Sequence, residues 1–137
     1  MNAITSIRPA THQMKRGGSI VSFLRSRLHA ANSLQENLHA VFFDDARRVL
    51  GEKALGGTRS GSVRTRSREI LSDALALKAS GMIIAHNHPS GDCQPSEADL
   101  EATRKLSEVA RALDIELLDH LIITTTSAYS MRAGGKI

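Results

Sequence analysis

The stretch HNHPSGDCQPSEAD, residues 86–99, follows an apolar run at residues 82–85 and precedes a long amphipathic segment. If the apolar run is a strand, its period of two sends His86 and His88 to the same side. If the amphipathic segment is a helix capped by Ser96, Asp99 lies in its first turn and faces back toward the loop. The sequence therefore predicts that two imidazoles and one carboxylate converge on a zinc ion. Three protein ligands and one open position are typical of a catalytic rather than a structural zinc site.

The predicted chemistry is hydrolysis by an activated water molecule. Neutral imidazole and carboxylate are suitable zinc ligands, and zinc lowers the pKa of a bound water to about 7. Such a water needs a general base, which is usually a carboxylate. Ser96 lies one helical turn before Asp99, so its hydroxyl hydrogen could donate to a developing oxyanion while its oxygen caps the helix.

The pattern of apolar residues predicts alternating helices and strands, and hence an α/β or α+β fold with a mixed sheet sandwiched by helices. The short stretches at residues 1–18 and 58–68 have no apolar periodicity and are expected to be irregular. Helices are expected at Ser19–Ala31, Ser67–Lys78 and from a Ser96 cap to Leu113, and strands at 38–43, 49–55, 81–85, 115–118, 121–124 and 128–131.

Composition indicates one soluble domain with a basic start. The chain has 137 residues, a net charge of +4 and a single cysteine, Cys93, which excludes an intramolecular disulfide and fits a reducing compartment. No apolar run reaches the ~18 residues of a membrane span, and no secretion signal is evident, so we expect a cytoplasmic protein. Five basic residues precede the first acid, Glu36, and predict a basic N-terminal arm: Arg8, Lys15, Arg16, Arg25 and Arg27.

Other metal-site families fit the sequence less well. HNH nucleases spread their three residues over a ββα unit, whereas the His-Asn-His here is contiguous. Zinc deaminases require a second cysteine after the histidine motif, and Cys93 stands alone. Amidohydrolases with an H-x-H motif need a barrel of about 250 residues, which this chain cannot build.

The string H-x-H-P followed by S-x-x-D resembles the JAMM (JAB/MPN+) metalloprotease motif, and the fuller string resembles the RadC branch of that family. Supporting matches are Gly57-Thr58, Arg68-Glu69-Ile70 and Leu118-Asp119-His120, and the resemblance extends from Leu38 to Met131. It implies a cytidine-deaminase-like three-layer fold, a zinc ion held by His86, His88 and Asp99, and hydrolysis of a peptide or isopeptide bond. It also implies a glutamate general base near the second strand, for which Glu52 matches best and Glu69 is the competing candidate.

The resemblance divides the chain into residues 1–35, a basic arm and helix, and residues 36–137, a RadC-like JAB/MPN domain. Full-length RadC proteins carry a helix-hairpin-helix DNA-binding region ahead of this domain, so the chain resembles the short, single-domain type. His120 is interpreted either as a core histidine or as a residue that orients a metal ligand.

Two further functions stay open at this stage. Arg64, Arg66 and Arg68 alternate along the chain and could form a basic face for nucleic acid, in keeping with the family's association with DNA repair, or a solvated charge cluster. A binding module that keeps the metal without catalysis is the third alternative. The expected partner is a peptide or protein substrate, with nucleic acid as the alternative, and the sequence predicts no oligomeric state.

Overall fold

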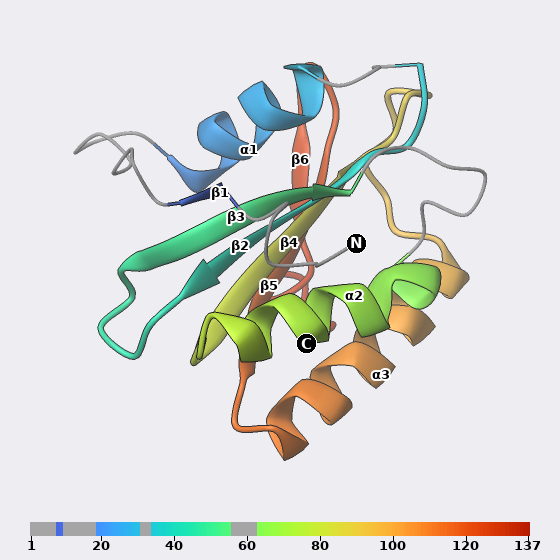
Figure 1. Cartoon of the computed structure of the whole chain (residues 1–137). Helices are drawn as coiled ribbons and strands as arrows, with labels where there is room; N and C mark the ends of the chain where they lie inside the picture. Colours follow the sequence, from blue (N-terminus) through green and yellow to red (C-terminus); the bar gives the residue numbers. More distant parts are fainter. Residues whose placement is uncertain (1–7, 10–18, 31–33, 56–62) are drawn as a thin grey trace.

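The fold is a mixed β-sheet with helices on both faces (Figure 1). The computed structural model describes residues 8–9, 19–30, 34–55 and 63–137. Among these residues no helix is long and apolar enough to cross a membrane. The elements in chain order are β1 (Arg8–Pro9), α1 (Ile20–Ala30), β2 (Leu38–Phe43), β3 (Val49–Leu55), α2 (Val63–Ala76), β4 (Gly81–Asn87), α3 (Glu97–Ala112), β5 (Glu116–Ile123) and β6 (Ala128–Ser130).

The strand order in the sheet is β1-β3-β2-β4-β5-β6. Only β4 and β5 run parallel, and α3 is the crossover between them, as a parallel pair requires. All other neighbouring pairs are antiparallel. Helix α1 covers one face of the sheet, and helices α2 and α3 cover the other (Figure 1). The predicted three-layer α/β class is confirmed.

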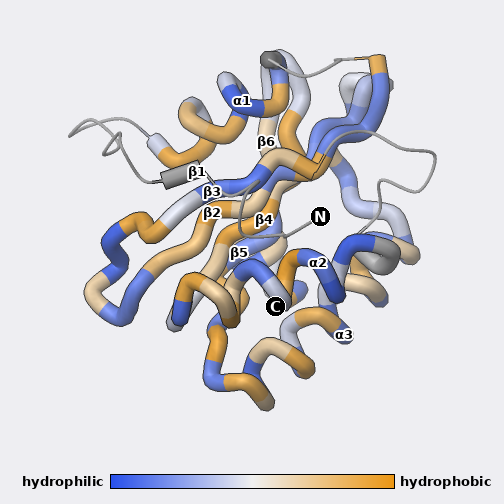
Figure 2. The backbone as a smooth tube through the Cα atoms, in the orientation of Figure 1, coloured by the Kyte–Doolittle hydropathy of each residue, from blue (hydrophilic) through white to orange (hydrophobic). Residues whose placement is uncertain are grey.

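The period of two along each strand separates two hydrophobic cores. In β4, Met82 and Ile84 join the core beneath α2 and α3, whereas Ile83 and Ala85 face α1. The antiparallel pairing of β2 with β4 continues this division, because residues paired across the strands share a face. Figure 2 shows hydrophobic residues along β4 and polar residues at the turn between β2 and β3. Any polar residue on β4 therefore has a face fixed by its position.

Three elements differ from the predicted ones. Helix α2 begins at Val63, within the Arg- and Ser-rich stretch that was expected to be irregular. Arginine is a good helix former, so this stretch is helical without the apolar periodicity on which the prediction relied. Strand β5 is continuous where two strands were predicted, because Asp119 and His120 find hydrogen-bond partners in its middle. Strand β1 lies within the N-terminal stretch expected to be irregular and pairs with β3.

Candidate metal centre

The two histidines of the H-x-H pair lie at the end of β4 on the face covered by α2 and α3. His86 is 3% exposed and continues the series of Met82 and Ile84 on this face. Its Nε2 atom lies 2.9 Å from Nε2 of His88. The predicted orientation of both side chains to one side is confirmed, and it places the two Nε2 nitrogens face to face.

Asp99 approaches this pair from the first turn of α3. Its Oδ2 atom lies 3.6 Å from His86 Nε2 and 3.5 Å from His88 Nε2. A capping box fixes the carboxylate: Ser96 N donates to Asp99 Oδ2, and Asp99 N donates to Ser96 Oγ. Burial raises the pKa of Asp99, but the two neighbouring imidazoles and the Ser96 N–H outweigh it and hold that pKa well below its usual range. The structure thus brings the three predicted ligands together and confirms Ser96 as the N-cap.

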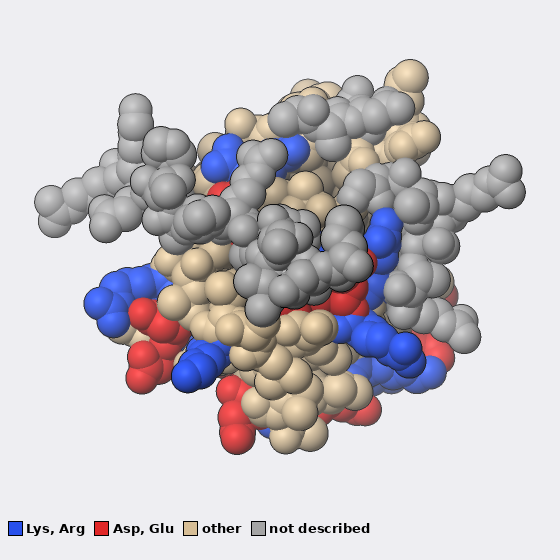
Figure 3. Space-filling view, in the orientation of Figure 1, with Lys and Arg blue, Asp and Glu red and all other residues tan. Residues whose placement is uncertain are grey.

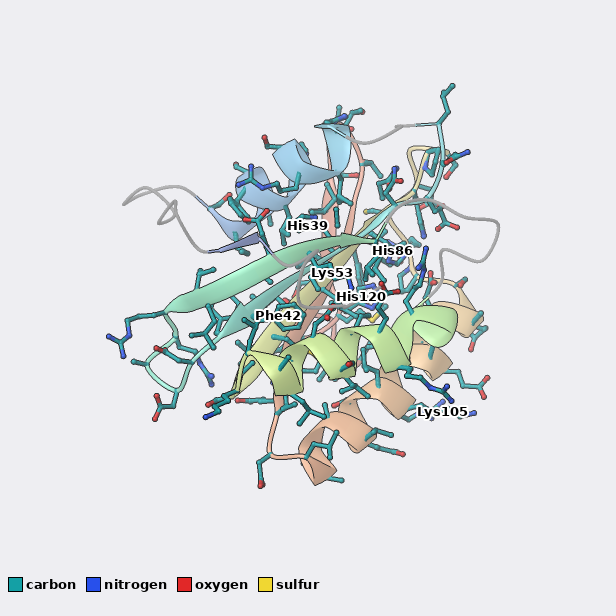
Figure 4. All side chains as sticks on the ribbon, in the orientation of Figure 1. His39, Phe42, Lys53, His86, Lys105 and His120 are labelled. Atoms are coloured by element: carbon teal, nitrogen blue, oxygen red, sulfur yellow. The ribbon has the colours of Figure 1, made fainter. Side chains whose placement is uncertain are left out.

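A chain of hydrogen bonds fixes the tautomer of His86. Thr103 Oγ1 donates its only hydrogen to the Asp99 carbonyl, so it accepts from His120 Nδ1 at 2.7 Å. His120 is fully buried, and burial together with the His86 imidazole lowers its pKa well below the usual value, which keeps it neutral. Its Nε2 atom therefore accepts from His86 Nδ1 at 2.7 Å, which leaves a lone pair on His86 Nε2. Figure 4 labels His86 and His120 close together beneath the sheet.

The backbone carbonyl of Asp92 fixes the tautomer of His88 in the same way. Its Nδ1 atom lies 2.8 Å from the Asp92 oxygen and must donate, so its Nε2 atom also carries a lone pair. Two lone pairs 2.9 Å apart beside a carboxylate repel each other unless a cation or a proton lies between them. In the metal-free protein, the hydrogen bond to Asp99 raises the pKa of His88 and favours that proton.

The donor set fits a zinc ion. A tetrahedral ion with ligands at about 2.1 Å separates them from one another by about 3.4 Å. The distances from Asp99 Oδ2 to the two nitrogens, 3.6 and 3.5 Å, are near this value. Both histidines also have the hydrogen-bonded Nδ1 atom that is typical of metal ligands.

Glu36 is a member of the site that the sequence pattern did not predict. Its Oε1 atom lies 3.5 Å from His88 Nε2 and 3.8 Å from His86 Nε2, and its side chain is 50% exposed. The three groups offer ligand atoms within 4.8 Å of one another. Leu38 pairs with His86, so extending the β2–β4 register by two residues puts Glu36 opposite His88. Glu36 lies two residues before Leu38, so alternation along an extended chain puts both side chains on the same face. This spacing was the signal for Glu36 that the sequence offered.

Asn87 holds the segment that carries Glu36. Its Oδ1 atom accepts from Asn37 N at 2.6 Å, and its Nδ2 atom donates to Gln35 O at 2.9 Å. The Asn87 backbone N–H also donates to Asn37 O. The middle residue of the His-Asn-His sequence thus binds the main chain on both sides of Glu36.

Glu52, the predicted general base, is not brought to His86 and His88. It pairs with Val41 across β2 and β3, and Val41 belongs to the core that faces α1. The carboxylate contacts Arg27 at 2.6 Å and His39 at 3.1 Å. Burial raises the pKa of Glu52, but the Arg27 and His39 contacts outweigh it and lower that pKa overall. The sheet therefore lies between Glu52 and the histidine pair.

Glu69, the competing candidate, belongs to a different charge cluster on α2. Its Oε1 atom lies 2.9 Å from Lys53 Nζ, and its Oε2 atom lies 3.0 Å from Arg66 NH1. Lys53 Nζ also lies 2.7 Å from Asp73 Oδ2. Glu69 thus forms ion pairs at the interface between β3 and α2.

The arginines expected to form a basic face have varied surroundings. Arg66 forms an ion pair with Glu69, Arg68 is exposed, and the side chain of Arg64 lies outside the described residues. From the predicted basic arm, Arg25 donates to the Thr124 and Ser127 carbonyls. Figure 3 shows Lys and Arg next to Asp and Glu on the visible face. Nucleic-acid binding stays a prediction.

The sequence of this chain is similar to those of known proteins. A family model described as RadC-like JAB domain matches residues 14–136. A UPF0758 protein of Acidithiobacillus ferrooxidans is 38% identical over 133 residues, which cover 93% of this chain and 59% of that protein. Two other UPF0758 proteins are 35% identical (Cupriavidus pinatubonensis, 81% of this chain and 49% of that protein) and 30% identical (Vibrio vulnificus, 90% and 57%). The chain thus spans about half to three-fifths of the length of these relatives, and it belongs to the RadC-like JAB domain family.

Proposed function

We propose that this chain is a zinc-dependent hydrolase of peptide or isopeptide bonds, with His86, His88 and Asp99 as zinc ligands and Glu36 as the general base. One observation carries the proposal: two imidazole lone pairs and a carboxylate oxygen converge, with a half-exposed second carboxylate beside them. Family membership supports a JAB-type hydrolase in general terms.

The donor set suits zinc, and the ion would supply Lewis-acid activation of a water molecule and of the scissile carbonyl. His86 and His88 bind through Nε2, because both Nδ1 atoms are engaged as donors. Asp99 stays ionised, because its pKa is held low, and it contributes the negative charge of the ligand set.

Glu36 takes the role first assigned to Glu52. Its Oε1 atom is near both ligand nitrogens and reaches solvent, so it can accept a proton from the attacking water and return it to the leaving amine nitrogen. Glu52 lies on the other face of the sheet in contact with Arg27. Ser96 Oγ accepts from Asp99 N and keeps its own hydrogen, which we assign to the carbonyl oxygen of the substrate as negative charge develops there.

The test compares two conservative variants, Glu36→Gln and Glu52→Gln, with the wild type. Zinc content is measured by elemental mass spectrometry, and cleavage is measured on libraries of quenched fluorescent peptides and of branched isopeptides. We expect about one zinc per chain in all three proteins. Cleavage should fall by about 10²–10⁴-fold in Glu36→Gln, the usual contribution of a general base, and stay within a few-fold in folded Glu52→Gln.

Two results contradict the proposal. Folded wild-type protein that takes up no zinc at neutral pH rejects the metal centre. Zinc-loaded Glu36→Gln that cleaves as well as the wild type rejects the assignment of the base. If no protein of the set cleaves any library although zinc is bound, the result favours the alternative of a metal-containing binding module.

A further inference from the structure

A cavity of about 230 Å³ is lined in part by His88, one of the three proposed zinc ligands. Helix α1, the loop after β4 and the end of β5 form its walls, including Leu28, His88, Pro89 and Ile123. Leu28 and Ile123 are buried and belong to the core on the α1 face of the sheet. His88 belongs both to the wall of this cavity and to the proposed zinc site, so a group bound in the cavity contacts a residue of the reaction centre.

The polar groups of the cavity wall are mostly engaged within the protein. Arg25 donates from Nε and NH2 to the Thr124 and Ser127 carbonyls. The Asn87 amide binds the main chain at residues 35 and 37. Thr124 Oγ1 contacts Ser127 Oγ at 2.6 Å. With these polar groups engaged, the wall offers a ligand the apolar surface of Leu28, Pro89 and Ile123.

The size of the cavity sets an upper limit on its occupant. A protein cavity of about 150 Å³ holds benzene, whereas sites for drug-sized ligands start at about 300 Å³. At about 230 Å³ the cavity accommodates one large side chain. Gly91 also lines the cavity; its φ of +88° turns the loop, and a Cβ added to it would meet no atom of the described residues within 4 Å.

We propose that this cavity is a substrate subsite for an apolar side chain, of the size of leucine or phenylalanine, on the residue next to the scissile amide. The assignment rests on the proposed function, because it takes the histidine pair as the reaction centre. The proposed subsite restricts the substrate class to peptides or isopeptides with a large apolar residue next to the scissile bond.

The first experiment measures binding to the zinc-loaded full chain by titration calorimetry. N-Acetyl-L-leucine hydroxamate and N-acetylglycine hydroxamate test the acyl side of the bond, and isobutylmalonyl and malonyl monohydroxamates test the amine side. The hydroxamate is a zinc-binding group, so each pair differs only in an isobutyl group. We expect the isobutyl compound of one pair to bind about tenfold more tightly than its parent, the effect of burying a leucine-sized side chain.

The second experiment needs no metal. Methyl NMR spectra of the metal-free protein are recorded with N-acetyl-L-leucine amide and with N-acetylglycine amide. The leucine compound should shift the methyl signals of Leu28 and Ile123, and the glycine compound should leave them in place. This readout keeps the subsite testable even if zinc uptake fails and the proposed function falls.

A matched pair of variants localises the effect. Thr125 lines the cavity and is exposed, whereas Thr126 is exposed next to it and does not line the cavity. Thr125→Trp should abolish the isobutyl preference and the methyl shifts without changing the binding of the glycine parent, and Thr126→Trp should preserve both. The proposal is overturned if the isobutyl compounds neither bind more tightly than their parents nor shift the two methyl signals, or if the two variants behave alike.

Discussion

Thr103 Oγ1 lies 2.7 Å from Nδ1 of His120, and the direction of that hydrogen bond determines which nitrogen of His86 is free. The threonine hydrogen is engaged by the Asp99 carbonyl, which belongs to a proposed ligand residue. The proposed metal ligands on the strand and on the helix, His86 and Asp99, are thus connected through two buried side chains. Such outer partners usually change metal affinity by about 10–100-fold.

Thr103→Val tests this connection. Valine keeps the shape of threonine but removes the acceptor of His120 Nδ1, so the His86 tautomer is no longer fixed. We expect zinc affinity to fall by about tenfold, measured by competition with a fluorescent chelator, and stability to fall by about 1–3 kcal/mol because a buried donor loses its partner. Thr126→Val, at an exposed position, is the control, and zinc affinity equal in both variants would contradict the tautomer argument.

Asn87→Ala tests the positioning of Glu36. Without the amide, the main chain at residues 35–37 loses two hydrogen bonds, so hydrogen exchange of its backbone amides should accelerate. We expect kcat to fall by about tenfold or more, because small displacements of a reacting group slow catalysis strongly. Zinc affinity should change less than twofold. Gln94→Ala, an exposed amide in the loop after β4, serves as control; a loss of zinc binding that parallels the loss of kcat would instead make Asn87 a general support of the site.

Glu52→Gln is expected to change stability rather than chemistry. The folded-state pKa of Glu52 lies below its ordinary value of 4.5, so its ion pair contributes stability above pH 4.5 that is lost as pH falls through the folded-state pKa. At pH 7 the variant should be less stable by about 2 kcal/mol, the range of hydrogen bonds to charged groups. The difference in urea unfolding free energy between wild type and variant should shrink at pH 4 and below. A difference that is independent of pH would contradict the assignment.

The Lys53–Asp73 pair allows a test of the core beneath α2 and α3. Both side chains are buried, and neither carboxylate oxygen of Asp73 accepts a well-aligned hydrogen bond from the described residues. Lys53→Met leaves this carboxylate without its nearest cation, so we expect a loss of about 3–5 kcal/mol in unfolding free energy. The double variant Lys53→Met with Asp73→Leu should recover at least half of that loss. Lys105→Met, on the exposed face of α3, is the control, and an equal effect at both lysines would show that the buried pair is unimportant (Figure 4).

Much of the fold could be predicted from periodicity in the sequence. Apolar runs located four of the described strands, β2, β3, β4 and β6, to within a few residues, and the Ser96-x-x-Asp99 spacing located the start of α3. The misses have a common cause. A helix can start in an Arg- and Ser-rich stretch without apolar periodicity, and a strand such as β5 can carry polar residues in its middle when partners elsewhere in the chain bind them.

The sequence by itself determined that the three predicted ligands converge. Two of them are two residues apart at the end of one strand, and a local helix cap positions the third. Local geometry suffices for such groups. Only the tertiary structure showed where the glutamates lie, because their positions depend on the pairing of β2 with β4 and of β2 with β3. Those pairings put Glu36 next to His88 and Glu52 on the face covered by α1. Register between strands far apart in the chain is set by packing of the whole sheet, and a motif does not encode it.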